Sequence, residues 1–439
     1  MSTRVLIVGG GIAGLTAALH LRERDFQVTV VEQANQVGGR LIHAPPPLLL
    51  GAHAATWAIL KSLHRDNALR RVPHTPIEFL KADGGRVQFL HLPLPSPLNT
   101  LLGTTLFQGL SMRDRWHLLS FLERTWEQDP PLPSDLELRV ADEWLTSIGQ
   151  SEGARYGVWN ALSRFLLGAS LKQVSAALFM RTLRRCFFTG ARTAKLIVPS
   201  QGAWACLVAP LKERLEALGV QFRLGATVQQ IRFDRDRVHG VELADRQTLA
   251  ADWYVAALSR PALTPLVPER VVTHYAYFQQ LGRLTESPHV MVQLHLAHPS
   301  KKTQLVLLEN RSFHWMIRQP DHVLEEQHSI VWAVAVGETA LLARHDDELV
   351  RRAMDDVAAA FPSPDAPQAV SSRCHRTPQA ILDVRPGVQQ YRPLPKSPFG
   401  NFLLAGDWTD TGWPANLESA ILSGQRCAET IATETVAST

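Results

Sequence analysis

The first 32 residues alternate between strand and helix patterns. Residues 4–8 (RVLIV) are a short apolar run that ends at glycine, as expected for a buried parallel strand. Residues 12–23 carry apolar side chains at helical spacing, and residues 27–32 (QVTVVE) form a second strand pattern. This order predicts a βαβ unit of about thirty residues, in which both strands belong to one parallel sheet.

Beyond residue 60 the pattern becomes mainly helical. Two strand patterns flank Gly84-Gly85, and this pair of glycines predicts a β-hairpin. The apolar spacing that follows predicts four helices, over residues 113–127, 138–149, 152–167 and 173–187.

The second half of the chain returns to mixed patterns. Residues 204–218 predict an amphipathic helix that ends at Gly219, and several strand patterns follow it. Alternating apolar positions between residues 270 and 336 predict an antiparallel sheet, and a further helix is expected over residues 346–360. Residues 403–424 read as a strand, a turn and a helix.

Composition narrows the range of partners. The 439 residues include 45 Lys and Arg against 41 Asp and Glu, which gives a net charge of +4 spread along the chain. This balance predicts no nucleic-acid partner, although it allows loose attraction to an anionic membrane surface. The four cysteines form no CxxC pair, so we expect no metal site. The N-terminus lacks a signal-peptide pattern, which predicts a cytoplasmic protein.

Residues 87–112 form a long window without Asp, Glu, Lys or Arg. Pro93, Pro95 and Pro97 argue against a membrane-spanning helix in this window. One interpretation is a loop that dips into the membrane and forms the mouth of a pocket, which would place the protein peripherally on the inner face of the plasma membrane. The alternative is a buried, proline-bracketed segment.

The first strand–helix turn carries a dinucleotide fingerprint. Gly9, Gly11 and Gly14 fit G-x-G-x-x-G, in which the first glycine makes the tight turn and the second lets the backbone approach a pyrophosphate. The third allows the helix and the strand to pack closely. The pattern predicts that an adenine dinucleotide binds at this turn.

The residues around the fingerprint strengthen this prediction. Ile12 and Ala13 open the helix, so their backbone N–H groups and the helix dipole face the phosphates. Glu32 ends the second strand, 23 residues after Gly9, where an acidic side chain binds a ribose. The same carboxylate would repel a 2′-phosphate, which disfavours NADP.

The stretch after Glu32 separates FAD from NAD. Gly38-Gly39-Arg40 resembles the GGR motif of the amine oxidase/phytoene desaturase flavoprotein superfamily. In that superfamily the glycines let the chain pass close to the pyrophosphate, and the arginine donates charge-assisted hydrogen bonds. The resemblance implies FAD as the cofactor, held in part by Gly39 and Arg40. The alternative is a surface turn beside a solvated arginine.

The C-terminal segment resembles the second half of the same flavin site. In the superfamily a late strand ends in Gly-Asp, which Gly406 and Asp407 match, and the aspartate accepts hydrogen bonds from the ribityl chain. LESAILSG resembles the helix start MEGAxxSG and implies that Asn416 and Leu417 lie beside the flavin ring. Val228 matches the valine that lines the adenine.

The order of these landmarks implies a discontinuous FAD-binding domain. We expect an α/β architecture in which a Rossmann-type FAD-binding domain carries a mixed α+β substrate cap. The FAD-binding domain is expected to comprise residues 1–60, 196–265 and 396–439. The substrate-binding cap is expected to comprise residues 61–195 and 266–395.

Further segments favour one branch of the superfamily. TDTGWPANLESAILSGQR, LHLPLPSPLNTLLG and GLSMRDRWHLLSFL resemble bacterial hydroxysqualene dehydroxylase, also known as squalene-associated FAD-dependent desaturase. The resemblance implies a long apolar isoprenoid substrate, in hopanoid or squalene synthesis, and hydride transfer from reduced FAD to an allylic carbon as hydroxyl leaves. Asp410, Trp413 and Asn416 are the candidate pocket residues. The electron donor or acceptor stays open, because the sequence has no second dinucleotide fingerprint.

Three alternatives stay open. A carotenoid-type desaturase would run the hydride transfer in the opposite direction. An amine oxidase is disfavoured because Asn416 stands where those enzymes place a tyrosine of the aromatic cage. A non-catalytic FAD-binding paralogue is suggested by a departure from the family, since the segment after Arg40 is short and lacks the DNGQH motif.

Overall fold

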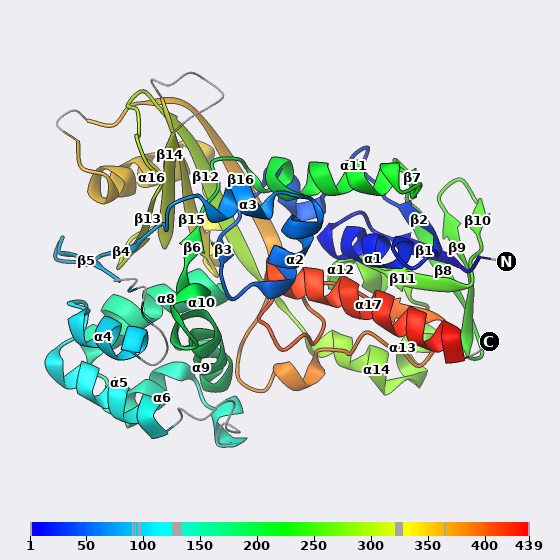
Figure 1. Cartoon of the computed structure of the whole chain (residues 1–439), viewed down its shortest axis with the longest axis horizontal. Helices are drawn as coiled ribbons and strands as arrows, with labels where there is room; N and C mark the ends of the chain where they lie inside the picture. Colours follow the sequence, from blue (N-terminus) through cyan, green and yellow to red (C-terminus); the bar gives the residue numbers. More distant parts are fainter. Residues whose placement is uncertain are drawn as a thin grey trace.

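The computed structural model describes residues 2–89, 92, 94, 98–124, 134–320, 328–363 and 366–437. Pro93, Pro95 and Pro97, which argued against a spanning helix, lie outside the described residues. Figure 1 shows both chain ends at one end of the molecule, beside a parallel sheet, and a larger sheet with a helical layer at the other end.

The first sheet is parallel and contains the predicted βαβ unit. Its strand order is β17-β11-β1-β2-β7, which puts β1 in the centre. The bounds of these strands are β1 Arg4–Val8, β2 Gln27–Val31, β7 Gln221–Arg223, β11 Trp253–Ala256 and β17 Phe402–Leu404. The predicted α/β, Rossmann-type fold is therefore confirmed.

The alternation of side chains in β1 explains the layers on either side of this sheet. Val5 and Ile7 pack with α1 (Ile12–Arg22), α11 (Ala209–Ala217) and α17 (Leu417–Ala437). Leu6 and Val8 point the other way, towards a three-stranded antiparallel sheet. That sheet comprises β8 (Val228–Asp234), β9 (Arg237–Leu243) and β10 (Thr248–Leu249). Because successive strand residues face opposite sides, β1 is buried on both.

The second sheet has seven strands in the order β16-β12-β15-β14-β13-β4-β5. It is antiparallel except for the β13–β4 pair, and β4 and β5 form the predicted hairpin. One face packs against α16 (Asp346–Ala360), the helix expected over residues 346–360. The bounds are β4 Ile77–Leu80, β5 Arg86–Gln88, β12 Glu286–Leu296, β13 Gln304–Leu308, β14 Trp315–Pro320, β15 Ser329–Val336 and β16 Ala369–Leu382.

A helical layer covers the other face of this sheet, at the lower left of Figure 1. The predicted helices are present, but two of them are interrupted by π-helical turns, at η3 and η4. The window at residues 87–112 contains helix α4, whereas one of its two interpretations from the sequence was a loop. The bounds are α4 Leu98–Leu106, α5 Met112–Arg124, α6 Ala141–Ser147, α7 Glu152–Ala154, η3 Arg155–Trp159, α8 Asn160–Leu167, α9 Ala176–Leu183 and η4 Arg184–Phe188.

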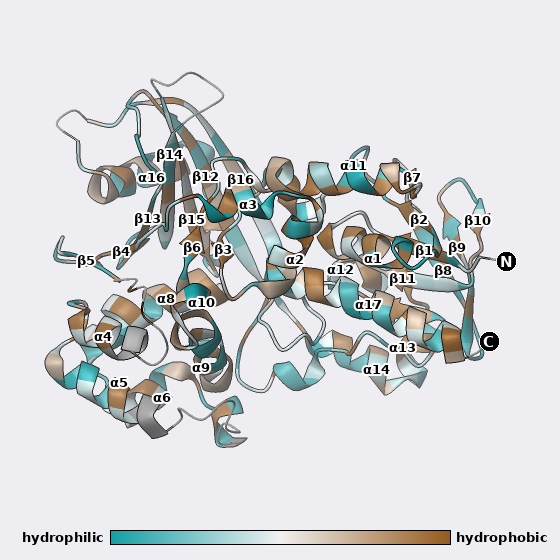
Figure 2. Ribbon diagram, viewed as in Figure 1, coloured by the Kyte–Doolittle hydropathy of each residue, from teal (hydrophilic) through white to brown (hydrophobic). Residues whose placement is uncertain are grey.

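Short elements complete the described chain. The hydropathy colouring in Figure 2 shows apolar positions mixed with polar ones along the helices of both parts. The predicted boundaries between the two domains stay a prediction. The remaining main elements are η1 Gly39–His43, β3 Leu49–Leu50, α2 Ala54–Ser62, α3 Asp66–Arg70, α10 Ala191–Ala194, β6 Leu196–Ile197, η5 Trp204–Val208, α12 Arg260–Leu263, α13 Glu269–His274, α14 Ala276–Gln279, α15 Thr339–Leu342 and η8 Gln389–Tyr391.

The two terminal helices, α1 and α17, pack side by side at very close range, as the blue and red helices of Figure 1 show. A Cβ atom placed on Gly424 of α17 would lie 2.2 Å from the carbonyl oxygen of Ala13 in α1. Only glycine allows this approach, which holds the C-terminal helix against the fingerprint helix.

This contact gives the first prediction. Gly424→Ala should lower the free energy of unfolding by at least about 2 kcal/mol, because the methyl group must push the two helices apart. Gly282→Ala is the matched control, because no described atom lies within 4 Å of the Cβ position at Gly282. Chemical denaturation of both variants measures the effect, and equal stabilities would contradict it.

Candidate functional site

The three fingerprint glycines differ in the space around them: neighbouring atoms crowd the Cβ positions of two, whereas the third faces open space. Gly9 has φ +108°, and a Cβ atom there would lie 2.4 Å from the carbonyl oxygen of Ala257. A Cβ atom on Gly14 would lie 2.1 Å from the carbonyl oxygen of Gly9. At Gly11, by contrast, no described atom lies within 4 Å of the Cβ position. Gly9 and Gly14 are therefore required for packing, and Gly11 faces open space.

The GGR segment borders the same space. The nearest described atom to a Cβ on Gly39 is the Cα of Gly11, at 3.6 Å. Helix α1 begins here with Ile12 and Ala13, and its N-cap, Gly11, has no side chain to occupy the first N–H groups. A helix N-terminus and two glycine segments around open space suit a diphosphate.

Glu32 holds the turn and the neighbouring strand together. Its carboxylate accepts hydrogen bonds from the backbone N–H groups of Gly10, at 2.7 Å, and Ala34, at 2.9 Å. Its carbonyl accepts one from Ala226 at 3.0 Å, which brings the start of β8, and with it Val228, to the same end of the sheet. Each carboxylate oxygen has a further lone pair that can accept from a ribose hydroxyl.

Arg40 and Asp407 meet although 367 residues separate them in the sequence. Arg40 Nη2 donates to Asp407 Oδ1 at 2.7 Å, and Arg40 Nη1 donates to the carbonyl of Ala380 in β16. The Arg40 side chain is half exposed, whereas that of Asp407 is 12% exposed. The structure thus brings the two motifs of the sequence-based FAD prediction into one ion pair.

The loop after Gly406 is held by a residue that the sequence analysis missed. Arg392 is buried, and its guanidinium donates to the carbonyl oxygens of four loop residues. These are Asp407 at 2.9 Å, Trp408 at 3.3 Å, Thr409 at 2.5 Å and Trp413 at 2.6 Å. Burial lowers the pKa of Arg392 to about 10, partly offset by the charges of Asp410 and Asp407, so the side chain stays charged at neutral pH.

The start of α17 is fixed by its own first residues. Asn416 Oδ1 accepts from the backbone N–H of Ser419 at 2.8 Å, so this side chain serves as a helix cap. Leu417, the first helical residue, is half-buried. Ser419 stands where the superfamily motif has glycine, and its hydroxyl donates to the carbonyl of Asp407 at 2.9 Å. The serine therefore ties the helix to the Asp407 loop.

Glu418 joins α17 to α2 and was also missed. Its buried carboxylate accepts from the backbone N–H groups of Ala55 at 2.8 Å and Thr56 at 2.9 Å, and from the Thr56 hydroxyl at 2.7 Å. Burial raises the pKa of Glu418, and these hydrogen bonds oppose the rise. The starts of the two helices consequently lie together.

The candidate pocket residues differ in what they face. Asp410 Oδ1 accepts from the backbone N–H of Gly412 at 3.1 Å, so its carboxylate turns into its own loop. Trp413 is buried, with the ring of His53 edge-on at 5.4 Å and the guanidinium of Arg185 over its face at 5.4 Å. His53, which is itself buried, was not predicted to be functional.

The short segment after Arg40 docks on the seven-stranded sheet. It forms the 3₁₀ turn η1 (Gly39–His43), and the ring of His43 stacks on that of His375 in β16 at 5.6 Å. The ring of His375 in turn stacks on Trp332 of β15 at 6.5 Å. The shortened segment therefore covers the sheet beside Arg40 with aromatic rings.

These features match a known family. The family model described as flavin containing amine oxidoreductase matches residues 12–432. The chain belongs to this flavin-containing amine oxidoreductase family. The chain is an FAD-dependent oxidoreductase of the amine oxidase superfamily, and FAD is its cofactor.

Individual relatives are similar to this chain in sequence, and solved structures are similar to it in fold. The chain is 25% identical to 15-cis-phytoene desaturase of Synechococcus elongatus, over 98% of this chain and 95% of the relative. It is 24% identical to zeta-carotene desaturase of Synechocystis, over 98% and 97%. An engineered double mutant of putrescine oxidase superposes with a TM-score of 0.74 at 16% identity, over 99% of each chain.

The described residues fit FAD. Gly11, Gly39 and the start of α1 can hold the diphosphate, while Glu32 can hold the ribose of the adenosine. Asp407 and Arg40 can bind the ribityl–diphosphate portion. When bound, the flavin supplies hydride transfer, and the chain's own role is to hold it and to exclude water.

The second prediction concerns Asp407. Asp407→Asn keeps the size of the side chain but removes its charge, so both Arg40 and the flavin lose a carboxylate acceptor. We expect the dissociation constant of FAD to rise at least about tenfold, because hydrogen bonds to charged groups are the stronger ones. Titration of apoprotein with FAD, followed by flavin fluorescence, measures this change.

The matched control is Asp252→Asn. Asp252 pairs with Arg4 at 3.5 Å, and both side chains are about half exposed. Removing an exposed ion pair changes the stability of a protein little, so this variant should bind FAD as the wild type does. An unchanged affinity in Asp407→Asn would contradict the assignment of Asp407 to the flavin.

Proposed function

We propose that this oxidoreductase acts on a long apolar isoprenoid, and that its reaction is the reductive dehydroxylation of hydroxysqualene to squalene. The observation that carries the proposal is an aromatic cavity between the helical layer and the seven-stranded sheet. About 450 Å³ of this region is free of protein atoms when the space open to solvent is counted, but the centre of a water-sized sphere can occupy only about 20 Å³ of it, so the lining side chains must move apart to admit a long chain.

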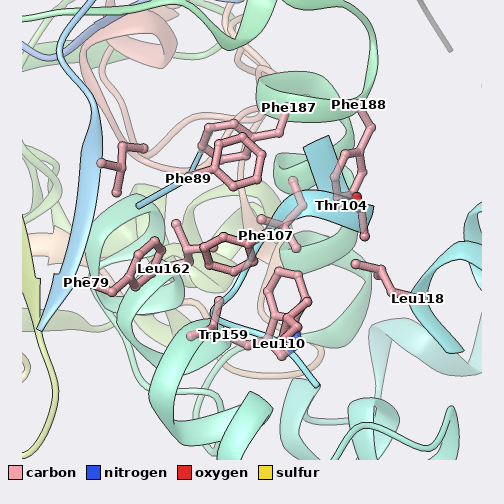
Figure 3. A pocket seen from close by; sticks show the side chains of 13 residues that line it. Phe79, Phe89, Thr104, Phe107, Leu110, Leu118, Trp159, Leu162, Phe187 and Phe188 are labelled. Carbon is pink, nitrogen blue, oxygen red and sulfur yellow. The ribbon is translucent and has the colours of Figure 1, made fainter. Parts of the chain in front are cut away.

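The lining of the cavity suits a hydrocarbon chain. Figure 3 shows the rings of Phe79, Phe89, Phe107 and Phe187 gathered around it. Among the described residues that line it, Thr104 alone carries a hydroxyl group. Such a surface binds by removing apolar area from water, and it provides hardly any polar partner for a charged or sugar-like substrate.

One helical turn connects the cavity with the flavin site. Leu183 and Phe187 line the cavity, and Arg185, between them in the sequence, lies over Trp413 and donates to the carbonyl of Gly412. Arg185 and Phe187 belong to the π-helical turn η4, and π-helical turns often occur at functional sites. The cavity and the loop after Asp407 therefore contact the same helical turn.

Dehydroxylation replaces a C–O bond by a C–H bond. One hydride and one proton are consumed, and one water molecule leaves. Reduced flavin would supply the hydride, and the apolar cavity would keep bulk water from the reacting carbon. The segments TDTGWPANLESAILSGQR and LHLPLPSPLNTLLG support this reaction over others in the family, through their resemblance to hydroxysqualene dehydroxylase.

The second candidate is a carotenoid-type desaturase. The relatives named phytoene desaturase and zeta-carotene desaturase favour it. In that reaction a hydride would pass from a hydrocarbon to oxidised flavin, and an electron acceptor would be needed to complete the cycle. The same cavity could hold either substrate, so the direction of hydride transfer must be measured.

The third prediction separates the two reactions. Anaerobically reduced, FAD-loaded protein should convert hydroxysqualene to squalene with one molecule of product per flavin, measured by gas chromatography with mass spectrometry. Oxidised protein supplied with a quinone should leave phytoene unchanged. Turnover of phytoene without turnover of hydroxysqualene would replace the first proposal by the second.

We further propose that helices α4 and α5 contact a membrane surface that contains anionic lipid. Four large apolar side chains are exposed on these helices, at 43% for Leu102, 51% for Leu106, 71% for Met112 and 70% for Trp116. Arg113, next to Met112, is exposed as well. Thr104, Phe107 and Leu118 in the same region line the cavity, so an isoprenoid could pass from the bilayer into it.

Among the described residues, no helix is long and apolar enough to cross a bilayer.

The fourth prediction is that the protein binds vesicles of phosphatidylcholine and phosphatidylglycerol, measured by flotation. Replacing Met112 and Trp116 together by Glu should weaken this binding at least about tenfold, because two apolar groups lose their burial and two negative charges are added.

Val370→Glu is the matched control for vesicle binding. Val370 is 56% exposed on β16, an edge strand of the seven-stranded sheet, and so lies outside the helical layer that contains α4 and α5. The control should bind as the wild type does. Equal binding by the double variant and the wild type would contradict the proposal that α4 and α5 contact the membrane.

A further inference from the structure

One wall of the aromatic cavity is fixed in place by a hydrogen bond. Trp159 lines the cavity and is 5% exposed, and its indole N–H donates to Gln150 Oε1 at 2.8 Å. Gln150 is also buried, and its Nε2 donates to the backbone carbonyl of Asp114 in α5 at 2.9 Å. The ring of Phe179 lies edge-on to the indole at 6.5 Å. The indole can therefore turn away from the cavity only by breaking a buried hydrogen bond.

The other walls of the cavity carry no such anchor. Apart from Thr104, the other described lining residues have hydrocarbon side chains, which form no hydrogen bonds. The ring of Phe89 lies between two of them, at 5.7 Å from Phe107 and 5.6 Å from Phe187. Figure 3 shows Trp159 across the cavity from Phe187. The phenyl rings can shift without leaving a polar atom unpaired, whereas the indole cannot.

This difference decides how the cavity opens. A long chain enters only when lining side chains move apart, and contacts with the chain then replace the contacts that the phenyl rings lose. Moving the indole would leave its N–H and the buried oxygen of Gln150 unpaired. Such a loss corresponds to roughly a tenfold decrease in affinity or more. The cavity should therefore extend towards the phenyl rings and end at Trp159.

We propose that Trp159 limits the length of the isoprenoid chain that the enzyme accepts, and that it favours chains of squalene length over chains of carotenoid length. This inference rests on the proposed function, since it takes the cavity as the site of the substrate. The apolar lining suits both candidate substrates, so length is what distinguishes them in binding. The additional isoprene units of a carotenoid would have to displace the indole. Gln150 is a positioning residue, because it acts by holding that ring.

The test compares two saturated hydrocarbons of different length, squalane and the longer lycopersane, which is the saturated form of lycopene. Neither has an allylic carbon, so the oxidised, FAD-loaded enzyme binds them without turnover. The enzyme is incubated with phosphatidylcholine vesicles that contain both hydrocarbons in equal amounts, and it is then separated from the vesicles by size-exclusion chromatography. Gas chromatography with mass spectrometry measures the bound hydrocarbons. The wild type should retain at least about ten times more squalane than lycopersane.

Two variants and one control identify the residue. Trp159→Leu shortens the wall and should retain at least as much lycopersane as squalane. Gln150→Met keeps the indole but removes its acceptor, so the preference for squalane should fall at least about threefold. This second variant decides the matter if Trp159→Leu fails to fold, as judged from flavin content and melting temperature.

Trp57→Leu is the matched control. Trp57 is also buried, and its indole N–H donates to the carbonyl of Leu50 at 2.9 Å, but it lies outside the described lining of the cavity. The same substitution should therefore leave the preference for squalane as it is in the wild type.

The outcomes separate this inference from the proposed function, which the conversion of hydroxysqualene by the same preparation reports on its own. If folded Trp159→Leu keeps the preference, or if the wild type retains both hydrocarbons equally, the role of Trp159 is wrong and the proposed function stands. More lycopersane than squalane on the wild type would also overturn the inference, and would favour the carotenoid-type reaction. If the wild type retains neither, the cavity is not the hydrocarbon site, and the inference fails together with the observation that carries the proposed function.

Discussion

The flavin site depends on one buried guanidinium. The Arg392 side chain is buried, and its guanidinium donates to the carbonyl oxygens of Asp407, Trp408, Thr409 and Trp413. A buried charge without hydrogen-bond partners raises the free energy of the folded state strongly. The loop therefore cannot move these carbonyls away without destabilising the fold. The direction of the Asp407 side chain towards Arg40, and the place of Trp413 beside the cap, follow from this constraint.

Local patterns predicted the elements that are fixed locally. The unit β1–α1–β2 was readable because its strands are buried on both faces and its helix has a glycine-rich start. Strand β16 (Ala369–Leu382) was missed because most of its side chains are exposed and polar, so that only its pairing with β12 defines it. Helix α4 (Leu98–Leu106) was not predicted: prolines precede it, and the two interpretations of its window were a loop at the membrane and a buried, proline-bracketed segment. In both cases tertiary context outweighed the local signal.

The residues of the candidate site also divide into those that stand in a local sequence motif and those that only the tertiary structure identifies. Arg40 and Asp407 stand in short motifs, so the sequence pointed to them, and the structure pairs them. Arg392 lies in a Pro-rich stretch, and the role of Glu418 depends on the N–H groups of a helix more than 350 residues away in the sequence. Neither role has a local pattern. Asn416 was weighed as a pocket residue, and the structure adds that its side-chain oxygen caps α17.

The fold alone does not choose between a hydrocarbon and an alcohol, since both suit an aromatic cavity. The short segment after Arg40 places His43 on His375, which extends the ring-lined surface beside Arg40. Burial of an apolar chain of given length against such rings stabilises either complex to a similar extent. The two reactions therefore differ in whether the flavin gives or takes the hydride, and not in how the apolar part of the substrate is held.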